Sequence, residues 1–246
     1  MRTAEGAGRR ALVTGATAGI GNAFARMFAR NGFALVLVAR DSVRLEALAR
    51  TLREAHGIDV EVLPADLATV AGCSAVEQRL ADRTAVVDVL VNNAGYGLGR
   101  ALLDNPLAAE QEMFDVLTRA VLRCSHVAAG TMREHGHGTI INVSSVAGWF
   151  PHTSYGAAKS YVTALSQAMD RQLRADGVRV MALCPGFTRT EFHDRADLDM
   201  RRLPRFFWLD ADALVEAAWR DLRRGRVVSV PGALYKVMRQ VLRFHP

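Results

Sequence analysis

Lysine is scarce in this chain. Only Lys159 and Lys236 occur among the 31 lysine and arginine residues of the 246-residue sequence. The formal net charge is +6, but the arginines are scattered and accompany no recognised nucleic-acid-binding motif. We therefore expect no nucleic-acid partner, and we expect most arginines to lie on solvated helix surfaces. The rarity of lysine makes the position of each one informative.

Cysteines and long apolar runs are also scarce. Cys73, Cys124 and Cys184 lack metal-ligand spacing and lie within or beside predicted elements, which favours reduced, buried thiols. No segment approaches the roughly 20 apolar residues that a membrane-spanning helix requires. Met1–Arg9 is small, polar and basic, with no apolar run behind it. These absences favour a cytoplasmic protein with no integral membrane segment. For the basic stretch 235–245, a docked terminal helix is favoured over a helix on a membrane surface.

Two kinds of catalytic centre lack support. His135 and His137 have a spacing that could suit a metal, but glycines place them in a turn and further ligands are missing. We assign no metal. The chain also has no Gly-x-Ser-x-Gly nucleophile elbow, which argues against a Ser-His-Asp hydrolase.

Apolar strand-like runs alternate with helical patterns along the whole chain, and the runs are too apolar to have one solvated face. We expect strands at Ala11–Val13, Ala34–Ala39, Val60–Leu63, Val86–Val91, Thr139–Val143, Val178–Leu183 and Val227–Val230. We expect helices at Asn22–Arg30, Ser42–Ala55, Val70–Ala81, Ala109–Arg133, Tyr155–Ala175 and Ala211–Arg223. The pattern predicts an α/β fold of the Rossmann type, with a doubly wound, mostly parallel seven-stranded sheet and helices on both faces. Residues 1–8 would be a flexible N-terminus and residues 9–246 one domain.

Tyr155 and Lys159 stand four residues apart at the start of a helical pattern, so a helix would place them on one face. A phenol titrates near pH ~10, and an adjacent cation lowers its pKa by favouring the phenolate. The pair is therefore a candidate acid and base for an alcohol or ketone. An ordinary helix in which the two meet by chance would show the same spacing.

A glycine-rich turn follows the first predicted strand and precedes a helix. Gly15, Gly19 and Gly21 lie in Thr14-Gly-Ala-Thr-Ala-Gly-Ile-Gly21, where a tight turn could hold a dinucleotide pyrophosphate. A plain structural loop would also use glycines, but the position after the first strand favours a binding loop.

These motifs together resemble those of the short-chain dehydrogenase/reductase family, over nearly the whole chain. The matching segments are Thr-Gly-x-x-x-Gly-x-Gly from Thr14, Asp66-Leu67, Asn92-Asn93-Ala94-Gly95, Asn142-Val143-Ser144-Ser145, Tyr155-x-x-x-Lys159 and Pro185-Gly186. Each of the segments outside the helical Tyr-Lys pair follows a predicted strand, as the family pattern requires.

The resemblance implies a role for individual residues. Tyr155 would exchange the proton with substrate, Lys159 would lower the tyrosine pKa and bind the nicotinamide ribose, and Ser145 would orient the substrate oxygen, with Ser144 as the alternative. The implied cofactor-binding residues are Gly15, Thr17, Ala18, Gly19, Ile20, Gly21, Arg40, Asp66, Leu67, Asn93, Ala94, Gly95, Tyr155, Lys159, Pro185, Gly186, Thr188 and Thr190. Asn92 and Pro185 could equally serve only to shape turns.

The end of the second predicted strand favours NADP(H) over NAD(H). Ala39 occupies the position where NAD-type members carry an acid, and Arg40 follows it. A guanidinium there suits the 2′-phosphate of NADP(H), whereas a carboxylate would bind the 2′-hydroxyl of NAD(H). Ala18 stands where many NADP-type members have a second basic residue, and Asp41 lies next to Arg40.

Leu117 is the clearest departure from the family pattern. It stands where members usually carry an asparagine that holds a proton-relaying water, and a leucine cannot hold that water. Thr118 or another group could substitute, catalysis could be slower, or the chain could be a non-catalytic NADP(H)-binding regulator or scaffold. The spacing from Ser145 to Tyr155 is also a few residues shorter than usual. His152, in the short loop, could touch substrate, but a solvent-facing side chain is favoured.

The segment 187–208 resembles the family's variable substrate lid. It is rich in large apolar residues: Phe187, Phe192, Met200, Leu203, Phe206, Phe207 and Trp208. With Trp149 and Phe150 these suggest an apolar pocket, although some would only pack the lid onto the sheet. We expect an oxidoreductase that moves hydride between NADP(H) and a small-molecule carbonyl or secondary alcohol. The resemblance also implies a homodimer or homotetramer formed through the long helices 109–133 and 155–175.

Overall fold

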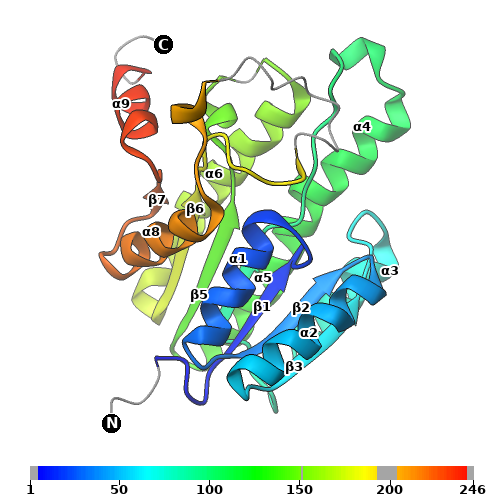
Figure 1. The fold of residues 1–246 in the computed structure, drawn as a ribbon, viewed down its shortest axis with the longest axis vertical. Coiled ribbons are helices and arrows are strands. Elements are labelled where there is room, and N and C mark those ends of the chain that lie inside the picture. Colours follow the sequence, from blue (N-terminus) through cyan, green and yellow to red (C-terminus); the bar gives the residue numbers. More distant parts are fainter. Residues whose placement is uncertain (1–4, 151, 193–203, 243–246) are drawn as a thin grey trace.

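The computed structural model describes residues 5–150, 152–192 and 204–242. Within them, one seven-stranded sheet has the order β3-β2-β1-β4-β5-β6-β7, and every neighbouring pair is parallel (Figure 1). The strands are β1 (Arg10–Thr14), β2 (Ala34–Ala39), β3 (Val60–Pro64), β4 (Val89–Asn92), β5 (Gly138–Val143), β6 (Val178–Leu183) and β7 (Val228–Ser229). This confirms the predicted parallel α/β fold. The order reverses at β1, so the loops after β1 and β4 open the crevice that such sheets use for ligands.

Helices cover both faces of the sheet. They are α1 (Gly19–Arg30), α2 (Ser42–His56), α3 (Val70–Leu80), α4 (Leu107–Phe114), α5 (Ala120–Glu134), α6 (Ser154–Leu173), α8 (Ala211–Arg223) and α9 (Ala233–Leu242). The core lies in two layers: α1, α2 and α8 pack on one face, and α3 and α5 on the other. Successive strand residues serve opposite layers, as Leu12 and Val13 do on β1. Because both faces are buried, the strands are apolar throughout.

The long predicted helix at 109–133 is interrupted. A π-helical segment, Asp115–Arg119, joins α4 to α5 and buries Val116, Leu117 and Thr118. The Thr118 hydroxyl donates to the Phe114 carbonyl at 2.6 Å. A π segment inserts one residue into the helical repeat, and apolar periodicity alone does not reveal it.

Both described ends of the chain are held against the domain. Glu5 accepts a hydrogen bond from the Trp219 indole at 3.2 Å, and the Gly6 amide donates to the Asn31 carbonyl at 2.8 Å. Of the predicted flexible N-terminus, Glu5 and Gly6 therefore contact the domain, and residues 1–4 lie outside the described ranges. At the other end α9, red in Figure 1, buries Tyr235 at 1 % exposure, as expected for a docked helix. In the described part of the chain no helix is long and apolar enough to span a bilayer.

Candidate active site

The loops after β1 and β4 are tied together at the centre of the sheet. The Thr14 hydroxyl accepts from the Asn93 and Ala94 amides at 2.9 and 3.0 Å. The Asn93 side chain donates to the carbonyls of Thr14 and Gly15 at 2.9 and 3.2 Å. Asn93 therefore supports the glycine-rich loop with its side-chain amide, beyond the ligand-lining role that the sequence implies.

The glycine-rich loop has the geometry of an anion cradle. Gly15 and Gly19 have φ of +65° and +54°, which only glycine adopts easily. A Cβ on Gly21 would lie 2.3 Å from the Gly15 carbonyl oxygen. No side chain caps the start of α1 at Ala18, so the first amides of that helix remain available to a ligand. These donors fit a pyrophosphate, because a helix N-terminus favours negative charge.

Helix α6 brings the candidate catalytic residues together. Its first turn is capped by the Thr153 hydroxyl, which accepts from the Gly156 amide at 3.1 Å. Tyr155 and Ser145 share a side-chain hydrogen bond. Lys159, 5 % exposed, donates to the Val143 carbonyl at 2.7 Å, and its Nζ lies 5.6 Å from the centre of the Tyr155 ring. The three predicted groups therefore occupy one site despite the short Ser145–Tyr155 spacing.

The two neighbouring serines have different surroundings. Ser144 is 2 % exposed, and its hydroxyl lies 2.7 Å from the Lys159 carbonyl and 2.8 Å from the Thr163 hydroxyl. Ser144 therefore links the end of β5 to α6 by hydrogen bonds. Ser145 begins the short helix Val146–Trp149, accepts from the Ala147 amide at 3.1 Å, and reaches Tyr155. This geometry favours Ser145 for the substrate oxygen.

Burial, rather than the neighbouring cation, dominates the proton affinity of this site. It raises the pKa of Tyr155 to about 12, while the hydrogen bond from Ser145 acts in the opposite direction. Burial also lowers the pKa of Lys159 to about 8. The predicted lowering of the tyrosine pKa by Lys159 is therefore wrong for this structure. The reason is geometric: the ammonium donates to Val143 and lies over the phenol ring.

On the adenosine side, Arg40 is exposed directly after β2. Asp66 and Leu67 follow β3; the Asp66 carboxylate accepts from the Ala68 amide at 3.0 Å, and Leu67 is 6 % exposed. Tyr96, which the sequence analysis missed, lies in the same region. Burial, the negative charge of Glu112 and a hydrogen bond to it raise the Tyr96 pKa to about 12.

The segment after β6 completes the crevice. The Pro185 carbonyl accepts from the Val146 amide at 3.0 Å, and the Thr188 hydroxyl donates to the Gly186 carbonyl at 3.0 Å. A Cβ on Gly19 would lie 2.8 Å from Thr190 Cγ2, so the glycine-rich loop and this segment are in close approach. Two of the predicted nucleotide-binding segments, the glycine-rich loop and the segment after β6, therefore lie side by side.

Part of the predicted lid, residues 193–203, lies outside the described ranges. Its two described ends form a stem, in which the Leu209 amide donates to the Phe187 carbonyl at 2.8 Å and the Arg189 amide to the Leu209 carbonyl at 3.1 Å. Tyr235 of α9 closes this stem. Its hydroxyl donates to the Phe207 carbonyl at 2.6 Å and accepts from the Phe187 amide at 3.0 Å. No sequence motif identifies Tyr235, since only the fold brings α9 to the lid.

Leu117 is fully buried beside the site. A Cβ on Gly95 would lie 2.7 Å from Leu117 Cδ2 and 3.8 Å from Lys159 Nζ, so an apolar side chain occupies the region next to the ammonium. The Thr118 hydroxyl, a candidate substitute, is bonded to the Phe114 carbonyl.

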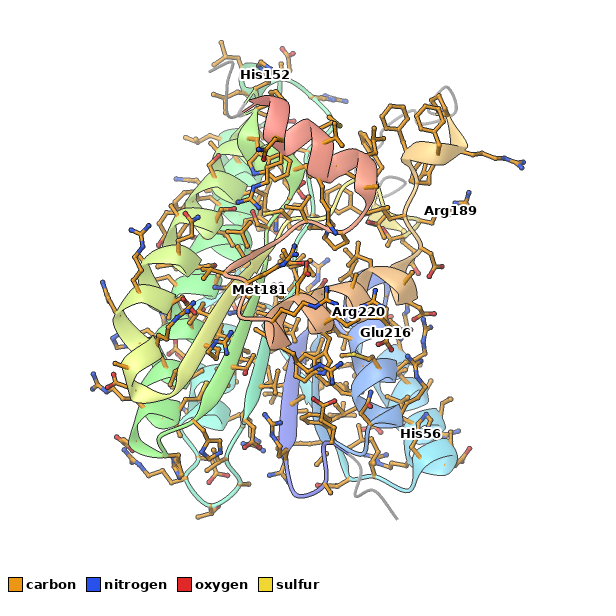
Figure 2. All side chains as sticks on the ribbon, turned by 90° about the vertical axis from the view of Figure 1, so that its left-hand side faces the viewer. His56, His152, Met181, Arg189, Glu216 and Arg220 are labelled. Atoms are coloured by element: carbon orange, nitrogen blue, oxygen red, sulfur yellow. The ribbon has the colours of Figure 1, made fainter. Side chains whose placement is uncertain are left out.

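The histidines considered in the sequence lie apart from the crevice centre. His152 is exposed at the upper edge of the molecule in Figure 2, with its ring stacked 6.5 Å from that of Phe150. His137 Nε2 lies 3.1 Å from the Asp88 carboxylate. Among the described residues, no cluster of three or more His, Cys, Asp or Glu could hold a metal ion.

Comparison with known proteins relates the sequence and the fold to one group of enzymes. Residues 9–201 match the profile of a family described as short chain dehydrogenase. A short-chain dehydrogenase from Sphingobium yanoikuyae, solved in complex with NADPH, is 36 % identical with a TM-score of 0.87, covering 97 % of this chain and 96 % of its own. A bulky-bulky ketone specific alcohol dehydrogenase from Comamonas testosteroni is 33 % identical with a TM-score of 0.84, covering 96 % and 91 %. The short-chain reductase protein NovJ from Streptomyces niveus is 36 % identical over 223 residues, covering 88 % of this chain and 80 % of NovJ.

Proposed function

Because the chain belongs to the short chain dehydrogenase family, we propose that it is an NADP(H)-dependent oxidoreductase that interconverts an apolar ketone and its secondary alcohol. The observation that carries this proposal is the hydrogen bond between Ser145 and Tyr155, with Lys159 buried behind the tyrosine ring. The NADPH complex of the Sphingobium relative and the ketone specificity of the Comamonas relative support it.

Two hydroxyls would act on the substrate oxygen. Nicotinamide, when bound, supplies or accepts the hydride at the carbonyl carbon. In the reductive direction, Ser145 donates a hydrogen bond to the oxygen as negative charge builds, and Tyr155 gives it a proton. Burial keeps the phenol protonated, because it raises the Tyr155 pKa to about 12. In the oxidative direction Tyr155 must first lose that proton.

The nucleotide would be held by donors that the crevice already presents. The uncapped start of α1 would bind the pyrophosphate, and the Thr188–Thr190 segment would lie beside the nicotinamide. Arg40, exposed at the end of β2, would bind the 2′-phosphate, because its guanidinium matches a phosphate in charge and in fork geometry.

Aromatic rings near Tyr155 favour an apolar substrate. The Phe192 ring lies 5.6 Å from the Tyr155 ring, and a Cβ on Gly97 would lie 3.3 Å from Phe192 Cζ. Phe150 and Phe187 are also partly exposed, at 37 % and 36 %. Such surfaces gain free energy by burying apolar ligand area.

Exposed apolar side chains on and before α4 support self-association as a homodimer or homotetramer. Leu103, Leu107 and Phe114 are 94 %, 73 % and 58 % exposed. Large exposed apolar side chains are candidates for an interface between proteins. Light scattering of the purified chain should report a species of two or four copies, and a monomer would contradict this part of the proposal.

The test compares Tyr155→Phe with Tyr161→Phe, which removes an exposed phenol from the same helix. Tyr155→Phe should lower the NADPH-dependent reduction of accepted ketones by at least about 10²-fold, because proton transfer is lost. NADPH binding should change little, and Tyr161→Phe should behave as wild type. Equal turnover by both variants would contradict the assignment. Tight NADPH binding without turnover of any ketone or alcohol by wild type would instead favour a non-catalytic scaffold.

A further inference from the structure

Arg44 joins three segments that border the nucleotide crevice. It lies in the first turn of α2, directly after β2. Its guanidinium forms a two-pronged ion pair with Glu191, at 2.7 and 3.2 Å, and also donates to the Thr17 carbonyl at 3.1 Å. Thr17 belongs to the glycine-rich loop, and Glu191 follows Thr190 at the base of the lid.

The Arg44–Glu191 ion pair contributes little to the stability of the fold. The Arg44 and Glu191 side chains are 41 % and 46 % exposed, and exposed pairs contribute only about 0–1 kcal/mol. The pair Arg30–Glu216, between α1 and α8, has the same exposure (43 % and 47 %) and touches no predicted ligand-binding loop. Arg44 differs in its place: it contacts Thr17 and lies four residues after Arg40, which directly follows β2.

A 2′-phosphate bound beside Arg40 would need a second cation near it. Ala18 provides none from the glycine-rich loop, and the Asp41 carboxylate, which accepts from the Arg44 amide at 3.0 Å, adds a negative charge. A phosphate dianion bound at Arg40 would therefore lie close to the Asp41 carboxylate of the next residue. Arg44 has the fork geometry that binds phosphate or carboxylate through two parallel hydrogen bonds.

We propose that Arg44 is a second recognition group for the 2′-phosphate of NADP(H), and that Glu191 is the carboxylate which this phosphate displaces from it. The inference rests on the proposed function and extends it to cofactor selectivity. Glu191 holds the guanidinium ready beside the glycine-rich loop and lowers the apparent affinity for NADP(H), because it competes for the same donors.

The experiment measures the dissociation constants of NADPH and NADH by calorimetry for wild type, Arg44→Met, Glu191→Gln and the double variant. Arg44→Met should weaken NADPH about tenfold, the effect of losing one charge-assisted contact, and leave NADH nearly unchanged. Glu191→Gln should tighten NADPH severalfold, and again not NADH. In the double variant the effect of Glu191→Gln on NADPH should disappear, because without the Arg44 guanidinium the carboxylate has no phosphate-binding donor to compete for. Arg30→Met and Glu216→Gln, the matched controls, should alter neither constant.

The outcomes separate this inference from the proposed function. If wild type prefers NADPH but Arg44→Met weakens both nucleotides equally, or not at all, Arg44 does not read the phosphate and only the inference fails. NADPH binding that is unchanged or weaker in Glu191→Gln would show that the carboxylate does not compete. If wild type shows no preference for NADPH, the cofactor choice in the proposed function fails, and this inference fails with it.

Discussion

Removing one hydroxyl from α9 should loosen the stem of the substrate lid. Tyr235 is 1 % exposed, and its hydroxyl is bonded to Phe187 and Phe207, the two described ends of the lid. Its ring also fills the space over Gly186, where a Cβ would lie 2.0 Å from the ring carbon Cζ. Tyr235→Phe keeps this packing and removes only the hydrogen bonds. It removes the Tyr235 hydroxyl as partner of the Phe187 amide and of the Phe207 carbonyl, both in a partly buried region.

The expected cost follows from those two groups. Each buried polar group left unpaired costs about 1–3 kcal/mol. Because both hydrogen bonds are only partly buried, we take the lower half of that range for each group, so the free energy of unfolding should fall by about 2–4 kcal/mol. A domain of this size loses about 2–4 °C of melting temperature per kcal/mol, which makes the shift easy to measure by thermal and urea unfolding. Because the loosened stem begins next to Gly186, the KM for ketone should rise more than kcat falls.

Tyr161→Phe is the control for this prediction. Tyr161 is 40 % exposed on α6, and loss of such a surface hydroxyl should change stability by no more than about 0.5 kcal/mol. The reasoning would be refuted if Tyr235→Phe unfolded at the same urea concentration as Tyr161→Phe. It would also be refuted for the lid if stability fell while KM and kcat stayed at wild-type values.

Three further predictions concern the catalytic centre. Ser145→Ala should lower kcat/KM by about 10²–10³ with little change in melting temperature, whereas Ser144→Ala should mainly lower stability, by about 1–3 kcal/mol; steady-state kinetics and thermal melts separate the two. Leu117→Asn should lower the melting temperature, because an amide enters a fully buried apolar site. The resemblance implies that an amide at this position supports proton supply to Lys159, so Leu117→Asn should also raise kcat. An unchanged kcat would show that this proton supply does not limit turnover. The pH profile of ketone reduction should be level below about pH 8 and fall above it as Lys159 loses its proton, since Tyr155 stays protonated up to about pH 12; a rate that rises from pH 8 to 10 would contradict these roles.

The fold was predictable because its determinants are local. Strands buried on both faces need apolar residues at every position, as in Ala34–Ala39, and this pattern is legible without coordinates. The turn at the end of β1 was also legible from the sequence, because its residues with positive φ, such as Gly15 and Gly19, are glycines. Boundaries were less accurate. β4 begins at Val89 rather than Val86, because pairing with β1 rather than apolar character decides where a strand starts.

The missed residues depend on contacts between distant parts of the chain. Tyr235 of α9 contacts Phe187, which lies 48 positions away in the sequence, and Arg44 contacts Glu191 over 147 positions. Spacing cannot show such contacts. The predicted direction of the Tyr155 pKa shift was wrong for a related reason. The sequence places a cation one helical turn from Tyr155, but it does not show that the phenol is buried or that the ammonium donates to the Val143 carbonyl.

The short connection between Ser145 and Tyr155 shows how packing can preserve a site when spacing changes. Between them, Val146–Trp149 form a short helical turn that lies directly on α6. Gly148 makes this possible, since a Cβ there would lie 2.9 Å from the Lys159 carbonyl carbon and from the Ser160 amide. The Ser160 hydroxyl donates to the Gly148 carbonyl and holds the turn in place. The distance between the two hydroxyls is therefore set by how closely this turn packs on α6, and the number of residues in the loop is secondary to it.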